Sequence, residues 1–183
     1  LDLLTRGTRQ LLTLVVAPAG AGKTMLLGSW VRSGQAPGPV IWLSLDSDDN
    51  DQARFWAYVL AGLRASGVAA ADGRLGTLVP PTASAADGFL LALVNGLAEL
   101  AGPVVLVLDD VHELTNPQVL AGIQFLVRHA PAQLRLVLAT RADPSLPLVR
   151  LLLAGTLTEI RAAELAFSPG EAAKLLGGLG TPL

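Results

Sequence analysis

Short apolar runs alternate with longer polar-apolar segments along this chain. The runs lie at 11–16, 40–45, 104–108, 134–139 and 157–160, with glycine or proline close to each. Mostly apolar runs of this length are typical of strands buried on both faces of a parallel sheet. We therefore predict that these segments form the strands of one mainly parallel sheet.

The segments between the runs carry apolar residues at helical spacing. Helices are predicted at 24–33, from about 51 to 66, at 85–100, at 117–129, and as a short helix within 143–154. Asn116 followed by Pro117 is typical of a helix start, and either Asn50 or Asp51 is expected to cap the second helix. Strands that alternate with helices predict a three-layer α/β fold.

The remaining segments predict no further strand. Residues 1–10 are expected to be a lead-in, and 67–84 a long surface loop. Ser168 and Glu171 form a capping box that predicts one more helix. We expect a first domain at 1–167, with 168–183 starting a following helical segment.

The first apolar run leads into a glycine-rich stretch, Ala17-Pro18-Ala19-Gly20-Ala21-Gly22-Lys23-Thr24. A strand, such a loop and then a helix are the parts of a phosphate-binding P-loop. Small residues let backbone N–H groups turn inward, and the helix N-terminus favours an anion. The predicted phosphate-binding residues are Pro18, Ala19, Gly20, Ala21, Gly22, Lys23, Thr24 and Met25.

Two residues of this stretch have separate roles in the prediction. Lys23 is expected to reach the β- and γ-phosphates and act in catalysis, and Thr24 to coordinate Mg²⁺. The usual pattern starts with glycine, whereas this chain has Ala17, so we expect an ordinary backbone conformation there. The alternative is a small-residue turn that happens to precede a lysine. A P-loop predicts the three-layer P-loop NTPase fold, with a five-stranded sheet in the expected order 2-3-1-4-5.

Acidic and basic residues follow two of the later runs. Asp109 and Asp110 end the run 104–108, and ligands of open α/β sheets bind at such strand ends. This is a Walker B arrangement, in which Asp109 would hold Mg²⁺ and Asp110 would orient or deprotonate a water. Arg141 follows the next strand, 134–139. It would face the γ-phosphate if that strand lies between the strand before the glycine-rich loop and the strand that ends in Asp109. The alternative for Asp109 is a solvated carboxylate in a turn, and the alternative for Arg141 is a surface salt bridge.

Composition narrows the candidate chemistry. The net charge is −2 and there is no cysteine, which argues against direct nucleic acid contact and a thiolate metal site. The acidic stretch from Asp46 lacks the glycine and glutamate of a calcium loop. His112 and His129 share no metal-ligand spacing.

No run is long enough to cross a membrane, so we expect no membrane partner and a cytoplasmic protein. Without an N-K-x-D sequence, an adenine nucleotide is the expected ligand.

Other features indicate a piece of a larger protein. The chain starts at Leu1, and only 15% of its residues are charged whereas 51% are hydrophobic. Soluble domains average about 25% charged residues. We expect neighbouring domains to cover part of this apolar surface.

Four stretches together resemble the nucleotide-binding domain of the large ATP-dependent LuxR-type transcriptional regulators, which are maltose-regulator-like members of the STAND class of P-loop NTPases. They are LTLVVAPAGAGKTMLLGSW, ending at Trp30, VIWLSLDSDDNDQARFWAYVLAGL at 40–63, VVLVLDDVHEL at 104–114, and LVLATRADPSLPLVRLLLAGTLTEIRAAELAFSPGEA at 136–172. In that family alanine at the first loop position is ordinary.

The resemblance implies an ATP/ADP switch with slow hydrolysis, in which ADP holds a resting monomer and ATP favours a self-oligomer that activates transcription. It implies phosphate binding by Gly22, Lys23 and Thr24, Mg²⁺ binding by Thr24 and Asp109, water polarisation by Asp110, and γ-phosphate sensing by Arg141. The partners would be adenine nucleotide and other domains of the same regulator. The alternatives are an ordinary P-loop ATPase or small-molecule kinase, and an interaction module with a vestigial P-loop.

Overall fold

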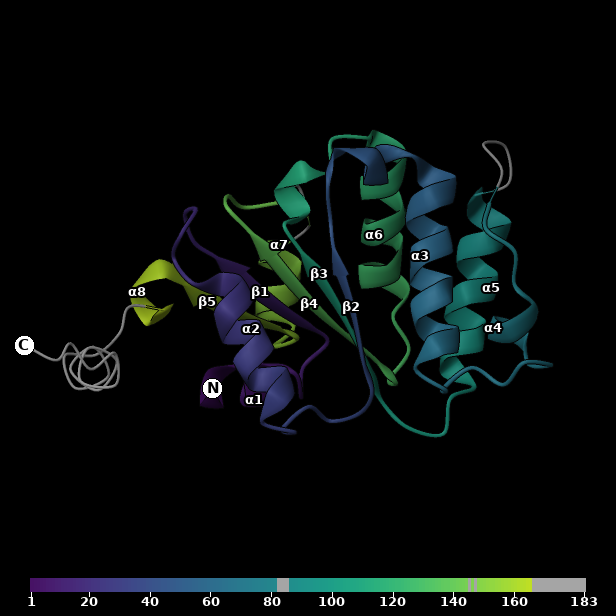
Figure 1. Ribbon diagram of the computed structural model, residues 1–183, viewed down its shortest axis with the longest axis horizontal. Coiled ribbons are helices and arrows are strands. Elements are labelled where there is room, and N and C mark those ends of the chain that lie inside the picture. Colours follow the sequence, from purple (N-terminus) through teal and green to yellow (C-terminus); the bar gives the residue numbers. More distant parts are fainter. Residues whose placement is uncertain (82–85, 145, 147, 166–183) are drawn as a thin grey trace, which may run out of the picture.

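The structure is a computed structural model that describes residues 1–81, 86–144, 146 and 148–165. Figure 1 shows its elements, which in chain order are α1 (Asp2–Gly7), β1 (Leu12–Val16), α2 (Lys23–Arg32), β2 (Val40–Ser44), the 3₁₀ turn η1 (Ser47–Asn50), α3 (Gln52–Ala65), α4 (Arg74–Thr77), α5 (Ala86–Ala98), β3 (Val104–Asp109), the 3₁₀ turn η2 (Val111–Glu113), α6 (Pro117–His129), β4 (Leu134–Thr140), α7 (Leu148–Leu153), β5 (Leu157–Arg161) and α8 (Ala162–Leu165).

The five strands form one parallel sheet in the order β2-β3-β4-β1-β5. The predicted α/β class and parallel sheet are confirmed, but the expected order 2-3-1-4-5 is wrong because β4 lies between β3 and β1. Leu136 of β4 is opposite Leu12 of β1 on one side and Leu106 of β3 on the other. All of β4 except Arg135 is buried, as suits a central strand. Hydrophobic runs predict parallel strands, but they do not specify which strands are neighbours.

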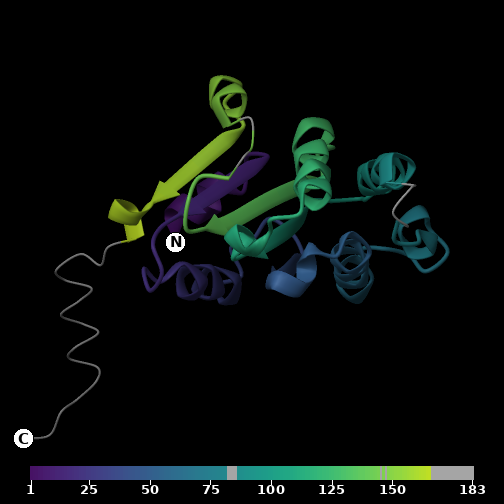
Figure 2. The ribbon, with the colours of Figure 1, turned by 90° about the horizontal axis from the view of Figure 1, so that it is seen from above.

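Alternate side chains of the strands build two cores, because successive residues of a strand point to opposite faces. On one face Leu14, Leu106 and Leu138 belong to a core shared with α3, α5 and α6. On the other face Val15 and Val137 pack with residues of α1 and α2. Figure 2 shows α2 on one side of the sheet and α6 on the other. These are the three predicted layers.

Polar caps start two of the core helices. Asn116 accepts a hydrogen bond from the Gln118 amide at 2.8 Å, with Pro117 at the first position of α6, as predicted. Of the two expected caps of α3, Asp51 is the one used, and it accepts from the Arg54 amide at 2.8 Å. Such caps satisfy backbone N–H groups that have no partner within the helix.

Short helices occur where irregular chain was predicted. The lead-in forms α1, which buries Leu4, and the long loop contains α4, which buries Leu75. One inward leucine in each explains why the chain folds there. The predicted helix from Ser168, and with it the boundary at 167/168, lies outside the described residues. Within the described part, no helix has the length and apolar character needed to span a membrane.

The contact between α6 and α3 requires a glycine. A Cβ added to Gly122 would lie 2.5 Å from Cζ2 of the fully buried Trp56, whereas one added to Gly88 of α5 would have nothing within 4 Å. Alanine at either position gains the same helix propensity, so we expect Gly122→Ala to be less stable than Gly88→Ala by about 1–3 kcal/mol, the cost of overpacking. Urea denaturation measures this difference. Equal free energies of unfolding would show that Trp56 can move aside.

Candidate functional site

The carboxyl ends of β1, β4 and β3 bring three predicted site segments to one edge of the sheet. Val16 of β1 is opposite Thr140 of β4, and Leu108 of β3 is opposite Leu138. The Ala17 amide donates to the Thr140 carbonyl at 3.2 Å, which joins the start of the glycine-rich loop to the end of β4. The loop after β1, the acidic turn after β3 and the segment after β4 therefore emerge at the same edge.

The glycine-rich loop depends on two glycines with positive φ. Gly20 has φ of 75° and Gly22 has φ of 83°, a region that L-residues with a Cβ avoid. Ala17 is not among the positive-φ residues, as expected. Gly22 is the N-cap of α2, so the helix begins at Lys23, one residue before the predicted start. Met25 lies in the first turn of this helix and is exposed.

Lys23 is buried inside the curve of this loop. Its Nζ donates to the carbonyl oxygens of Ala17 at 2.8 Å and Pro18 at 3.1 Å. An ammonium group has three N–H donors, so these two bonds leave one donor for a ligand. The carbonyls also explain how a positive charge is accommodated in a site where only 7% of the residue is exposed.

Thr24 and Asp109 are in direct contact. The Thr24 hydroxyl donates to Asp109 Oδ2 at 2.7 Å, and Oδ1 of the same buried carboxylate accepts from the Asp110 amide at 3.1 Å. Two neighbouring hard oxygen ligands fit Mg²⁺, which is commonly held by one or two protein groups plus phosphate and water. No group of three or more acidic, histidine or cysteine side chains gathers for a metal in the part of the chain that the structure describes. A Mg²⁺ here would depend on phosphate oxygens and water for its other ligands.

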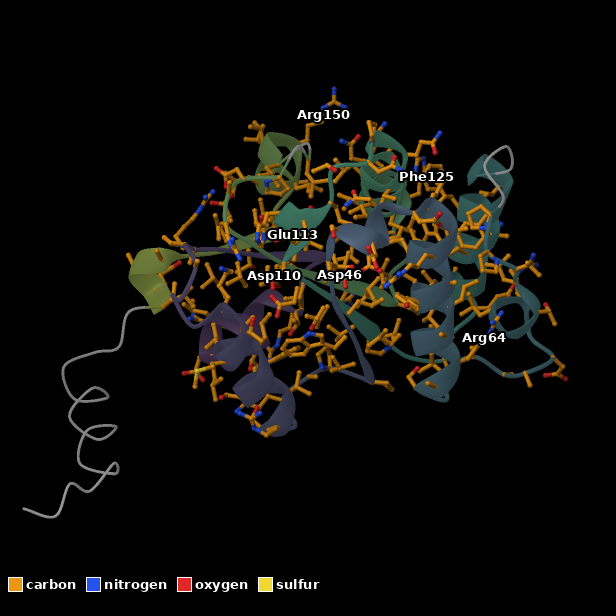
Figure 3. The ribbon with its side chains drawn as sticks, turned by 45° about the horizontal axis from the view of Figure 1, so that its top comes forward. Asp46, Arg64, Asp110, Glu113, Phe125 and Arg150 are labelled. Atoms are coloured by element: carbon orange, nitrogen blue, oxygen red, sulfur yellow. The ribbon has the colours of Figure 1, made fainter. Side chains whose placement is uncertain are left out.

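The acidic turn has an unusual backbone. Asp110 has φ of 60° and ψ of 41°, which makes it the single non-glycine residue with positive φ among the described residues. Aspartate tolerates this left-handed region better than most residues. His112 lies between two carboxylates, with Nδ1 3.7 Å from Asp110 Oδ1 and Nε2 3.3 Å from Glu113 Oε1. Figure 3 shows Asp110 and Glu113 at the same end of the strands as Asp46.

Arg141 begins the segment after β4, between the glycine-rich loop and the acidic turn. The predicted γ-phosphate contact required the strand before Arg141 to lie between the strands that precede the glycine-rich loop and the acidic turn. β4 does lie between β1 and β3. Arg141 is exposed, and it has no hydrogen bond or ion pair with the residues whose positions are described. Within the described part of the chain, the surface salt bridge considered as its alternative does not form.

A different arginine makes the ion pairs at this edge. Arg161 ends β5 and contacts Asp143 Oδ1 at 2.5 Å and Glu159 Oε2 at 3.0 Å. The hydrogen bonds to Glu159 and Asp143 raise the pKa of Arg161 above its ordinary value. Sequence reasoning missed Arg161, because only the pairing of β5 with β1 brings it level with Val16. Its bond to Asp143 anchors the segment that begins with Arg141.

Comparisons with known proteins identify a family and a similar fold. The sequence profile described as AAA ATPase domain matches residues 1–139. The fold is similar to that of Cdc6p from Pyrobaculum aerophilum, with a TM-score of 0.54 and 19% identity over 87% of this chain and 42% of that one. It is also similar to a chain of the Drosophila ORC structure bound to AT-rich DNA and Cdc6, with a TM-score of 0.55 and 12% identity over 100% of this chain and 60% of that one.

A third similar structure is the Aeropyrum pernix ORC1 protein in complex with DNA, with a TM-score of 0.53 and 18% identity over 97% of this chain and 46% of that one. At these identities the similarity is one of fold. The chain spans 42–60% of the length of these three proteins.

The left-handed backbone of Asp110 has a measurable cost. Glycine adopts this conformation without a steric penalty, whereas for alanine it costs about 1–2 kcal/mol. We expect Asp110→Gly to be more stable than Asp110→Ala by about 1 kcal/mol, as measured by thermal or urea unfolding. The reverse order, which is the usual one in a helix, would contradict the left-handed turn.

Proposed function

The chain belongs to the AAA ATPase domain family, and from this premise we propose that it is the ATP/ADP-binding switch domain of a LuxR-type transcriptional regulator of the STAND class, with slow ATP hydrolysis. The observation that carries the proposal is the contact of 2.7 Å between Thr24 Oγ1 and Asp109 Oδ2, which joins the start of α2 to the end of β3. The four family-like stretches support the finer assignment.

The proposed phosphate site is the loop from Pro18 to Gly22 with the start of α2. The left-handed glycines turn the backbone so that its N–H groups can face an anion, and the helix N-terminus adds partial positive charge. The ammonium of Lys23 already lies within the loop and would exchange carbonyl partners for β- and γ-phosphate oxygens. Met25, exposed on the first turn of α2, would border the bound nucleotide.

Thr24 and Asp109 would hold Mg²⁺, exchanging their mutual hydrogen bond for bonds to the metal. The metal, when bound, would neutralise negative charge on the phosphates. Asp110 follows Asp109 directly, and its partly exposed carboxylate would orient or deprotonate the attacking water.

Arg141 would distinguish ATP from ADP. An exposed guanidinium without a partner among the described residues is available to pair with γ-phosphate oxygens, which ADP lacks. A difference in binding energy between the two nucleotides can shift an equilibrium between a resting monomer and an ATP-bound oligomer. Exposed Val149, Leu152 and Leu153 on α7 are consistent with coverage by other domains of a larger cytoplasmic regulator.

The first test identifies the nucleotide and the role of Lys23. We expect chromatography of the denatured protein to release ADP or ATP, and calorimetry with Mg²⁺ to detect adenine nucleotide binding. Lys23→Ala should weaken binding by roughly 10–100-fold, because a charge-assisted hydrogen bond contributes about 1.5–3 kcal/mol.

Arg32→Ala is the matched control, since it removes a cation from the other end of the same helix. Unchanged affinity in Lys23→Ala would refute the loop assignment. Rapid steady turnover by the unmodified chain would favour an ordinary P-loop ATPase or a kinase over a switch.

Arg141 should affect ATP more than ADP. We expect Arg141→Ala to weaken ATP binding by about tenfold, which corresponds to about 1.4 kcal/mol, and to leave ADP affinity nearly unchanged. Arg9→Ala removes an exposed arginine that precedes β1, at the opposite edge of the sheet, and should alter neither affinity. Equal losses for ATP and ADP would argue against a sensor of the γ-phosphate. Calorimetric titration with both nucleotides measures the difference.

A further inference from the structure

The side-chain amide of Asn50 ties the segment after β2 to the segment after β3. Its Nδ2 donates to the Ser47 carbonyl at 3.0 Å and to the Glu113 carbonyl at 2.9 Å. Its Oδ1 accepts from the backbone amides of Thr115 at 2.6 Å and Asn116 at 2.8 Å. Residues more than 60 positions apart are thereby joined through one side chain.

This hydrogen-bonding pattern requires an amide. An amide has two N–H donors and an oxygen with two lone pairs, so these four short bonds match its donors and lone pairs, and the Thr115 hydroxyl adds a longer bond to Oδ1 at 3.4 Å. A further bond, from Asn116 Nδ2 to the backbone oxygen of Asn50 at 2.7 Å, closes the junction from the other side. Aspartate has nearly the same shape, but its carboxylate would face the Ser47 and Glu113 carbonyls without a proton to donate.

The segment that Asn50 holds contains the left-handed Asp110. The turn is fixed at its start by the Asp109 carboxylate, which accepts from the Asp110 amide at 3.1 Å. Asn50 fixes its end through Glu113, Thr115 and the start of α6. A residue with positive φ keeps that conformation only where its surroundings determine it, and the two ends of this turn provide that restraint.

We propose that Asn50 is a positioning residue for ATP hydrolysis, which holds the turn so that the Asp110 carboxylate lies where it can orient water. The inference rests on the proposed nucleotide site, but Asn50 itself touches no nucleotide-binding residue in the bonds described above. A substitution of Asn50 should therefore lower the rate of hydrolysis and leave the affinity for ADP nearly unchanged. Misplacement of a catalytic group by about 1 Å can lower a rate by roughly 100-fold.

The test compares Asn50→Asp with Asp51→Ala in single-turnover hydrolysis of Mg-ATP and in calorimetric binding of ADP. Asp51→Ala is the matched control, because it removes the cap of α3 at the next residue and leaves the bonds to the β3 turn in place. Thermal unfolding of both variants shows how far each loses stability. We expect Asn50→Asp to hydrolyse ATP at least about tenfold more slowly, with ADP affinity within about twofold of the unmodified chain. Asp51→Ala should hydrolyse ATP at the unmodified rate.

A second variant covers the case in which Asn50→Asp does not fold. Asn116→Ser keeps a side-chain oxygen to cap α6 but loses the N–H that donates to the Asn50 carbonyl, so it should slow hydrolysis to a smaller extent.

Each other outcome has a definite meaning. Unchanged hydrolysis in Asn50→Asp, or an equal loss in Asp51→Ala, would overturn the positioning role and leave the nucleotide site in place. If the unmodified chain binds ATP but does not hydrolyse it, the positioning role is also overturned, because there is then no hydrolysis for Asn50 to support. An unmodified chain that binds no adenine nucleotide would instead overturn the proposed function itself.

Discussion

The position of β4 between β1 and β3 is the constraint on which the candidate site depends. Strands in a sheet lie about 4.8 Å apart, so one intervening strand separates the ends of β1 and β3 by about 10 Å. The contact between Thr24 and Asp109 spans this separation, from the first turn of α2 to the end of β3. The same arrangement puts Arg141, at the end of the central strand, between the glycine-rich loop and the acidic turn.

The two buried charged groups of the candidate site, Lys23 and Asp109, each have hydrogen-bond partners. Lys23 is satisfied by loop carbonyls, and Asp109 by the Thr24 hydroxyl and the Asp110 amide. A buried charge without such partners costs several kcal/mol, so these bonds keep the site compatible with a folded domain. In the proposed site, the bonds of Lys23 to the loop carbonyls and of Thr24 to Asp109 would be exchanged for bonds to phosphate and Mg²⁺.

The acidic turn depends on longer-range contacts than the glycine-rich loop does. The loop is bent by its own glycines, a local property of the chain. The turn contains a left-handed aspartate and is held at its far end by Asn50, which comes from the segment after another strand. We infer that the proposed phosphate-binding and water-orienting parts of the site respond to different substitutions, because only the second relies on the junction between the segments after β2 and β3.

The sequence alone determined the five strands, the longer helices and the chemical groups of this protein, but not the short helices α1 and α4. The five apolar runs became strands, Asn116 became the predicted cap of α6, and the glycines around Lys23 formed the predicted loop, because each depends on residues close together in the chain. For α3 the sequence left two candidate caps, Asn50 and Asp51, and the structure uses Asp51. Tertiary structure alone decided the strand order, the ion pairs of Arg161 and the junction made by Asn50. Hydrophobic periodicity specifies which face of a strand is buried, but which strands become neighbours is decided by packing among segments that are distant in sequence.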